Sequence, residues 1–178
     1  MKPTSRASHL SPLQRRPCDM TKRDQVVLAV RSWLGTPYHH RARIKGHGVD
    51  CGQLILAAFF EAGLIDTYDP GFYTPDWHLH RDEDRYLAEV EKWLLRRSDD
   101  VDTTVTQRLI DDATYALPAG EVIVFRVGRT HSHGGIITQW PMFAHSYLPS
   151  GIAEEVDIRN TPMAERPARV YTFEGYES

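Results

Sequence analysis

The chain has 178 residues, of which 41% are hydrophobic and 25% are charged, and its formal net charge is −3. This length and composition predict one globular domain, and the slight negative charge argues against binding nucleic acid through a basic surface. No apolar stretch approaches the roughly 20 residues of a membrane span, and the start lacks the apolar core of a secretory signal peptide. We therefore expect a protein that is cytoplasmic when it is made.

The first residues differ in composition from the rest of the chain. Residues 1–20 are basic and polar, and we expect a disordered tail there, followed by a single domain over residues 21–178. Met20 is an alternative start of the folded part. The two cysteines, Cys18 and Cys51, are too few for a disulfide framework, so we interpret Cys18 as an incidental thiol of the tail.

Two amphipathic helices are predicted before the strands begin. The first spans residues 21–35 and starts with a capping box formed by Thr21 and Asp24. The second spans residues 83–97, beyond a loop of residues 66–80 that is rich in Pro, Gly and aromatic residues. Each helix has one apolar face, which comprises Val26, Val27, Val30, Trp33 and Leu34 in the first and Tyr86, Leu87, Val90, Trp93 and Leu94 in the second.

Cys51 lies between these helices, in "GVDCGQLILAAFF", where a helix start meets an apolar run. Asp50 is the predicted N-cap, Gln53 completes a capping box, and the residues up to Phe60 are apolar on every side, as expected of a buried helix. Unpaired backbone N–H groups and the helix dipole favour a thiolate at the first helical position. Asp50 opposes this effect, but we expect the dipole and a nearby histidine to keep the pKa of the thiol low.

Five short strands are predicted in the second half of the chain. A turn at Ala119–Gly120 leads into "EVIVFRV", and four further segments follow at hairpin spacing: "HGGIIT", "MFAHSY", "GIAEEVDI" and "RVYTF". Helices first and a meander of strands second predict an α+β fold, with one sheet and the helices packed on one of its sides.

Two of the nine histidines lie where a catalytic base is needed. His133 starts "HGGIIT" and His145 lies in the next strand, at an even separation. With a turn near residues 139–141, a hairpin places both side chains on one face of the sheet. Together with Cys51 they form the layout of a nucleophile, a base and an orienting group, whereas Cys51 alone is more typical of a small core residue. His131 is a rival base.

The other histidines allow one further interpretation. His39, His40 and His47 precede Cys51 and form with it an alternative zinc site. The spacing fits no common Cys/His pattern, and a structural zinc site usually has more than one cysteine. We therefore expect no metal, and we interpret the remaining histidines, which are His9, His78 and His80, as surface or packing residues.

Five segments, in this order, resemble the NlpC-type cell-wall peptidases, papain-like cysteine enzymes that cut peptidoglycan stem peptides: "LGTPYHH", "GVDCGQLI", "PAGEVIVFR", "SHGGII" and "FAHS". The segment "DWHLHRDEDRYL" and the long spacing between Cys51 and His133 resemble the phage-associated branch, which accompanies tail proteins of phages and phage-like particles. The resemblance covers residues 21–178. It implies a papain-like fold, with the nucleophile at the N-terminus of a buried helix packed on an antiparallel sheet.

The resemblance also implies a role for each of five residues. Cys51 corresponds to the nucleophile, His133 to the general base and His145 to the residue that orients the base. Tyr38 corresponds to a tyrosine that faces the site and helps to bind the oxyanion. Asp50 corresponds to the acidic residue before the nucleophile, which contacts the free amine of the substrate.

Two positions depart from the family pattern. The family more often has Asp-Cys-Ser-Gly where this chain has Asp-Cys-Gly-Gln at residues 50–53, and a bulkier residue often occupies the position of Gly134. Both departures change the walls beside the nucleophile without removing a catalytic atom. They therefore bear on substrate preference more than on reaction type.

Residues and resemblance together predict a cysteine peptidase that hydrolyses an amide bond in peptidoglycan stem peptides, between D-glutamate and the diamino acid. A phage tail is the expected carrier to the wall, and tail proteins are expected partners; no cofactor is expected. Two alternatives share the fold: a non-catalytic tail-assembly protein, and an amidase or transacylase with another substrate. Four arginines are candidates for binding stem carboxylates, although each alone is more typical of a solvated surface: Arg41, Arg43, Arg126 and Arg129.

Overall fold

The structure is a computed structural model, and it describes residues 20–71, 85–97 and 102–177. Residues 1–19 of the expected tail lie outside these ranges, as do His78 and His80. Within the described ranges, no helix has both the length and the apolar character that crossing a membrane requires.

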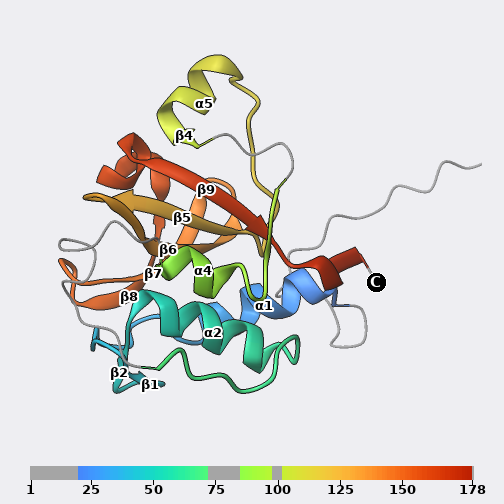
Figure 1. The fold of residues 1–178 in the computed structure, drawn as a ribbon, viewed down its shortest axis with the longest axis vertical. Coiled ribbons are helices and arrows are strands. Elements are labelled where there is room, and N and C mark those ends of the chain that lie inside the picture. The colour runs from blue at the N-terminus through green and yellow to red at the C-terminus, as the bar shows by residue number, and fades with distance from the viewer. Residues whose placement is uncertain (1–19, 72–84, 98–101, 178) are drawn as a thin grey trace, which may run out of the picture.

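A seven-stranded sheet forms the centre of the molecule (Figure 1). Its strand order is β3-β9-β5-β6-β7-β8, with β4 also paired to β9, and every neighbouring pair is antiparallel. The five strands expected from the sequence are confirmed as β5 to β9. The strands are β3 (Leu95–Arg96), β4 (Thr103–Thr104), β5 (Val122–Val127), β6 (Thr130–Gln139), β7 (Met142–Tyr147), β8 (Ile152–Asp157) and β9 (Pro167–Thr172).

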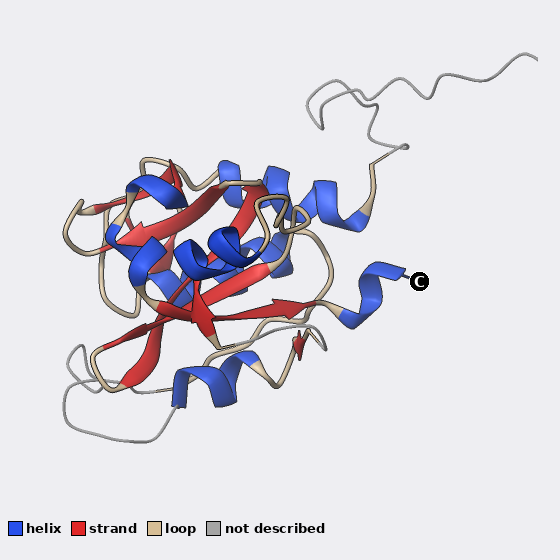
Figure 2. Ribbon diagram, turned by 90° about the horizontal axis from the view of Figure 1, so that it is seen from above, coloured by secondary structure: helices blue, strands red, loops and turns tan. Residues whose placement is uncertain are grey.

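Helices lie on both sides of this sheet (Figure 1 and Figure 2). Three of them contact β6 from one side: α1 (Lys22–Arg31), α2 (Cys51–Glu61) and α4 (Arg85–Val90). On the other side lie α5 (Val105–Asp111) and the 3-10 turns η3 (Ile158–Asn160) and η4 (Pro162–Glu165), and a further 3-10 turn, η5 (Glu174–Glu177), follows β9. The predicted capping box of α1 is confirmed, because the Asp24 N–H donates to the Thr21 hydroxyl at 3.1 Å and the Thr21 N–H donates to the Asp24 carboxylate at 3.0 Å.

The residues of β5 explain why both faces are covered. Val122 and Val124 belong to the core that contains α1 and α2, whereas Ile123 and Phe125 belong to a second core with Val105 of α5. These four side chains, the first four of the six in β5, are fully buried. The expectation of helices on one side only is therefore wrong. A strand that is apolar at successive positions has no face for solvent, and a second layer must cover it.

The last predicted helix is shorter than expected. It ends at Val90, and the chain then forms β3 along the edge of β9, where the Arg97 N–H donates to the Val170 carbonyl oxygen at 3.0 Å. Pairing with the unpaired backbone groups of the sheet edge competes here with continuation of the helix that the sequence pattern predicts.

Two residues of the expected buried faces are exposed. These are Leu34, after the end of α1, and Phe60, on the last turn of α2.

Two short pairs of elements have no counterpart in the prediction. The loop before Cys51 contains a hairpin of β1 (Arg43–Ile44) and β2 (Gly48–Val49), and β4 leads directly into α5. Strands of two residues are too short for any hydrophobic periodicity, so only their backbone pairing reveals them.

Candidate active site

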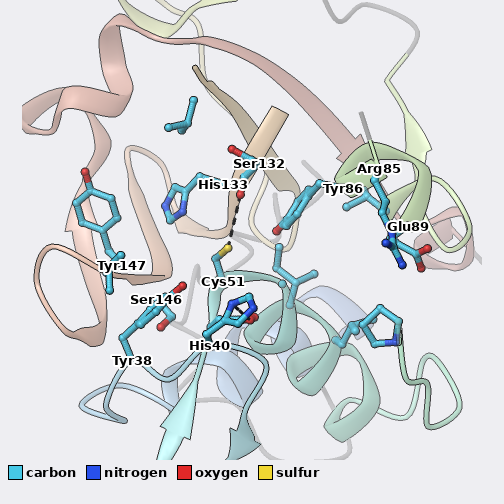
Figure 3. Close-up of a pocket in the computed structure, with 18 of the residues that line it drawn as sticks. Tyr38, His40, Cys51, Arg85, Tyr86, Glu89, Ser132, His133, Ser146 and Tyr147 are labelled. Atoms are coloured by element: carbon cyan, nitrogen blue, oxygen red, sulfur yellow. Dashed lines mark hydrogen bonds and ion pairs between the residues drawn. The ribbon is translucent and has the colours of Figure 1, made fainter. Parts of the chain in front are cut away.

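Asp50 holds the start of α2 and thereby the position of Cys51. One oxygen of its carboxylate accepts from the Gln53 N–H at 2.9 Å, and the other accepts from the Arg41 N–H at 2.7 Å. Arg41 reaches this place with a φ of 61°, in the left-handed region. Cys51 is the first residue of α2, and its sulfur lies 3.9 Å from the carbonyl oxygen of Ser132 in β6 (Figure 3). The capped helix therefore presents the thiol to the strand that carries the predicted base.

Strands β6 and β7 bring the two predicted histidines together. Ile136 pairs with Ala144 in the register, and His133 Nε2 lies 2.8 Å from His145 Nδ1. Both side chains are buried and lie on one face, as their even separation predicts. A Cβ at Gly135 would come within 2.7 Å of the Ala144 carbonyl oxygen and 3.1 Å of His145 Cβ. The glycine thus permits the close approach of the two strands beside the histidine pair.

A carboxylate in β8 extends this pair. Glu154 is the register partner of His145, and its Oε1 lies 3.5 Å from His145 Nε2. The sequence pattern does not single out Glu154, because "GIAEEVDI" contains two adjacent acidic residues that point to opposite faces. Only the pairing of β7 with β8 selects the one that reaches the histidine.

The Cys51 thiol is harder to ionise than a free cysteine. Burial is the largest cause and raises its pKa to about 12, and the Asp50 carboxylate adds to the rise. Backbone N–H groups of Gly134 and Gly52 and the hydroxyl of Tyr86 act in the opposite direction. The expected low pKa is therefore wrong for this site, because lost hydration of the thiolate outweighs the favourable helix start.

The imidazole pair is also neutral at physiological pH. Burial lowers the pKa of His133 to about 3, and His145 and Arg166 contribute to the same direction. Burial likewise lowers the pKa of His145 to about 4, although the Glu154 carboxylate opposes this change. At rest the site therefore contains a neutral thiol and a neutral imidazole.

Tyr38 approaches the site from the side opposite to Tyr86 (Figure 3). Its backbone is fixed by a hydrogen bond from its N–H to the Gly151 carbonyl oxygen at 2.7 Å and by a bridge to Val49. Burial raises the pKa of its phenol, and the proximity of Cys51 raises it further. Tyr38 therefore remains a proton donor beside the nucleophile.

A pocket of about 450 Å³ opens over Cys51 and is also lined by His133, Tyr38 and Tyr86. The arginines among its lining residues are Arg85 and Arg166. The four arginines that the sequence offers as candidates do not line this pocket: Arg41, Arg43, Arg126 and Arg129. In the case of Arg43, for example, the guanidinium turns to the Tyr68 carbonyl oxygen at 2.9 Å.

The alternative assignments for other histidines lack support in the described residues. His131 Nε2 lies 3.3 Å from Asp102 Oδ1, and His131 is not among the residues that line the Cys51 pocket. His40 Nδ1 lies 3.8 Å from Asp50 Oδ2. Across residues 20–71, 85–97 and 102–177, no three His, Cys, Asp or Glu side chains are grouped so that they could hold a metal ion, and the zinc alternative therefore has no ligand set.

Comparison with solved structures shows that the chain has the papain-like fold of NlpC/p60 proteins. The NlpC1 protein from Trichomonas vaginalis matches with a TM-score of 0.55 at 16% identity, over 89% of this chain and 47% of its own. The NlpC/p60 domain of the peptidoglycan hydrolase SagA matches with a TM-score of 0.50 at 14% identity, over 83% of this chain and 97% of its own. An N-acetylmuramoyl-L-alanine amidase from Bacteroides uniformis matches with a TM-score of 0.53 at 12% identity, over 85% and 98%.

These matches establish the predicted fold class. No protein-family model and no curated protein sequence matches the chain. The chain spans about half the length of the Trichomonas vaginalis protein.

Proposed function

We propose that this protein is a cysteine peptidase that hydrolyses an amide bond in peptidoglycan stem peptides. One observation supports this proposal most directly: Cys51 at a helix start lines the same pocket as His133, and His133 is hydrogen-bonded to His145. A thiol nucleophile requires a base within reach and a group that orients this base. We propose that the pair supplies both, with the Glu154 carboxylate 3.5 Å from His145 Nε2.

The hydrogen bond between the two imidazoles supports one proton path. His133 Nε2 is engaged with His145, and we propose that Nδ1 accepts the thiol proton. As this proton moves, the Cys51 sulfur bonds to the amide carbonyl carbon. The proton then passes to the leaving amine as the C–N bond breaks, and a thioester remains. Water attacks the thioester, gives a proton to His133 and releases the acid, and the cysteine thiol is restored.

The neutral resting state determines the order of events in this scheme. Because the pKa of Cys51 is raised and that of His133 is lowered, a preformed thiolate–imidazolium pair is disfavoured. We therefore propose that proton transfer to His133 accompanies attack on the carbonyl. We propose that Tyr38 and the Cys51 backbone N–H donate to the oxygen that becomes negative.

The proposed substrate follows from the sequence resemblance and from the similar structures. The resemblance implies the bond between D-glutamate and the diamino acid. A second candidate is the bond cut by an amidase, because the Bacteroides uniformis amidase shares the fold over 98% of its length. Both bonds are amides, so one chemical mechanism serves either.

We also propose delivery by a phage or phage-like tail after synthesis in the cytoplasm. This rests on the resemblance of "DWHLHRDEDRYL" to the phage-associated branch. Peptide mass spectrometry of purified particles from the producing cells tests it. Tail fractions that contain no trace of the protein would contradict it.

The proposed activity is tested with purified muropeptides, which are incubated with wild type and with Cys51→Ala and analysed by mass spectrometry. Fragments split within the stem, absent with the variant, support the peptidase. Release of the intact stem from the sugar identifies the amidase instead. No cleavage by folded wild-type protein, on muropeptides or intact walls, would reject both and favour a non-catalytic assembly protein.

A further inference from the structure

Tyr86 is brought to the nucleophile by α4. It is partly buried and packs against the main core cluster. Figure 3 shows its hydroxyl directed toward the Cys51 sulfur, on the side of the thiol away from Tyr38. No role for Tyr86 follows from the resemblance, which identifies a tyrosine only on the opposite side.

Two glycines make the room that this phenol occupies. A Cβ at Gly134 would lie 2.6 Å from the Tyr86 hydroxyl oxygen and 3.3 Å from Cζ, closer than side-chain atoms can approach. A Cβ at Gly52 would lie 3.4 Å from Tyr86 Cε2 and 3.9 Å from its hydroxyl oxygen. The hydroxyl is therefore held between the first turn of α2 and strand β6.

These are the two places where the sequence departs from the NlpC-type pattern. Gly52 replaces the common serine, and Gly134 replaces a bulkier residue. A larger side chain at Gly134 would displace the phenol, whereas a Cβ at position 52 would pack against its ring. Both departures therefore lie beside Tyr86, and the one at Gly134 leaves the space for its hydroxyl beside the thiol.

We propose that Tyr86 is a further catalytic residue of this site, whose hydroxyl donates a hydrogen bond to the Cys51 sulfur as the thiolate forms. The phenol keeps its proton throughout, and the proton lost by Cys51 goes to His133. The role rests on the proposed cysteine chemistry, but it concerns a property of the thiol that exists without substrate.

The environment of Cys51 explains why such a donor is needed. Burial and the Asp50 carboxylate both disfavour the thiolate. The opposing groups are the N–H groups of Gly134 and Gly52 and the Tyr86 hydroxyl, which lowers the pKa of the thiol. A hydrogen bond to an anion in a poorly hydrated site is stronger than one to a neutral group. Tyr86 therefore offsets part of the effect of burial.

The test measures the rate of Cys51 alkylation by iodoacetamide from pH 6 to 11, with peptide-resolved mass spectrometry. In Tyr86→Phe, we expect alkylation to slow about tenfold at every pH in this range, because the pKa of the thiol, which already lies above the range in the wild type, rises further. Gly134→Ala should give a similar rise, because its methyl group takes the place of the hydroxyl. In the Tyr86→Phe background, Gly134→Ala should add little.

Tyr176→Phe is the matched control. It also removes a phenol hydrogen bond, from Tyr176 to the Gly120 carbonyl oxygen at 2.8 Å, at a place away from the pocket. Its alkylation profile should equal that of the wild type. Circular dichroism and thermal melting establish that each variant is folded.

An unchanged alkylation profile in folded Tyr86→Phe would overturn the proposal. So would slower hydrolysis with unchanged alkylation, since the hydroxyl would then act on the substrate oxyanion instead of on the sulfur. Because alkylation needs no peptidoglycan, failure of the proposed peptidase activity leaves this result interpretable. A shifted profile without wall cleavage would support the role of Tyr86 and reject only the substrate.

Discussion

Two walls of the Cys51 pocket are held in different ways. The sheet wall consists of β6 and β7 and carries His133, which is backed by His145 and, on β8, by Glu154. Backbone pairing determines it, and each residue of β7 has a partner in β8. The helix wall consists of the six-residue α4 and carries Tyr86. Side-chain packing of α4 on the main core holds this second wall.

This difference separates two kinds of function. In a paired strand, the direction of each side chain follows from the register, so a base and its orienting group keep one geometry. A short helix is too brief to be stable by itself and takes its position from the side chains beneath it. We infer that proton transfer depends on the sheet wall, and that the helix wall adjusts the reactivity of the thiol.

The largest expected effect is on the sheet wall, in His133→Ala. Loss of the general base should lower kcat for muropeptide cleavage by about 100- to 10,000-fold. His131→Gln is the control, because His131 faces Asp102 and glutamine can still hydrogen-bond to it. Its rate should stay close to that of the wild type. Equal losses in both variants would contradict the assignment of His133 as the base.

Acid should lower the stability of the folded protein through the two histidines of the sheet wall. The folded pKa values of His133, about 3, and His145, about 4, lie below the value of about 6.5 for an unfolded histidine. Below pH 6.5 the unfolded chain therefore binds protons that the folded chain excludes. Stability is full above this pH and falls as the pH approaches 4, by up to about 1.4 kcal/mol per pH unit for each histidine.

Urea unfolding at pH 7.5, 6, 5 and 4 measures this loss. Carboxylates also titrate in this range, so the decisive quantity is the difference between wild type and a variant with His133→Gln and His145→Gln. We expect the variant to lose less stability on acidification. Parallel curves would mean that the two histidines do not resist protonation in the folded state.

Substitutions at two adjacent glycines, one facing each wall, compare the walls directly. A Cβ at Gly135 meets the Ala144 carbonyl oxygen at 2.7 Å, whereas one at Gly134 meets side-chain atoms of Tyr86 and Ile55. The Ala144 carbonyl is part of the paired strand β7 and cannot move aside, whereas the side chains that face Gly134 can. Gly135→Ala should therefore lower the free energy of unfolding by about 1–3 kcal/mol, and Gly134→Ala by less than about 1 kcal/mol. Urea unfolding at pH 7.5 tests this order, and a larger loss in Gly134→Ala would reverse it.

The smallest effect is expected for Glu154→Gln. The amide keeps a hydrogen-bonding group near His145 but removes the charge that raises the pKa of this histidine. We expect kcat to fall about fivefold, which corresponds to about 1 kcal/mol, while KM is unchanged. Glu155→Gln, on the opposite face of β8, is the matched control. Similar losses in both variants would exclude a positioning role for Glu154.

Much of this arrangement is readable from local patterns. The Thr21 capping box, the cap at Asp50 and the five strands of the meander occur where the sequence predicts them. The even separation of His133 and His145 places them on one face, and their hydrogen bond follows from the hairpin. These features depend on residues that are close together along the chain or are joined by one tight turn. The sequence pattern alone therefore predicts them.

Other features depend on contacts between distant segments. The edge of β9 converts the end of the last predicted helix into β3, and the β7–β8 register selects Glu154. The raised pKa of Cys51 could not be predicted, because the helix start is visible in the sequence but its burial is not. Tyr86 likewise belongs to an ordinary amphipathic pattern until Gly52 and Gly134 are seen beneath it.

The sequence by itself determined the order of Cys51, His133 and His145 along the chain, and the helix start and strands that carry them. Only the tertiary structure decided which carboxylate of β8 lies beside the histidine pair, how far burial raises the pKa of the thiol and which further tyrosine lies beside its sulfur. Periodicity and capping are local and follow from bonds of fixed geometry. Burial and electrostatic environment depend on which distant surfaces come together, and one sequence read along its length does not contain that distance information.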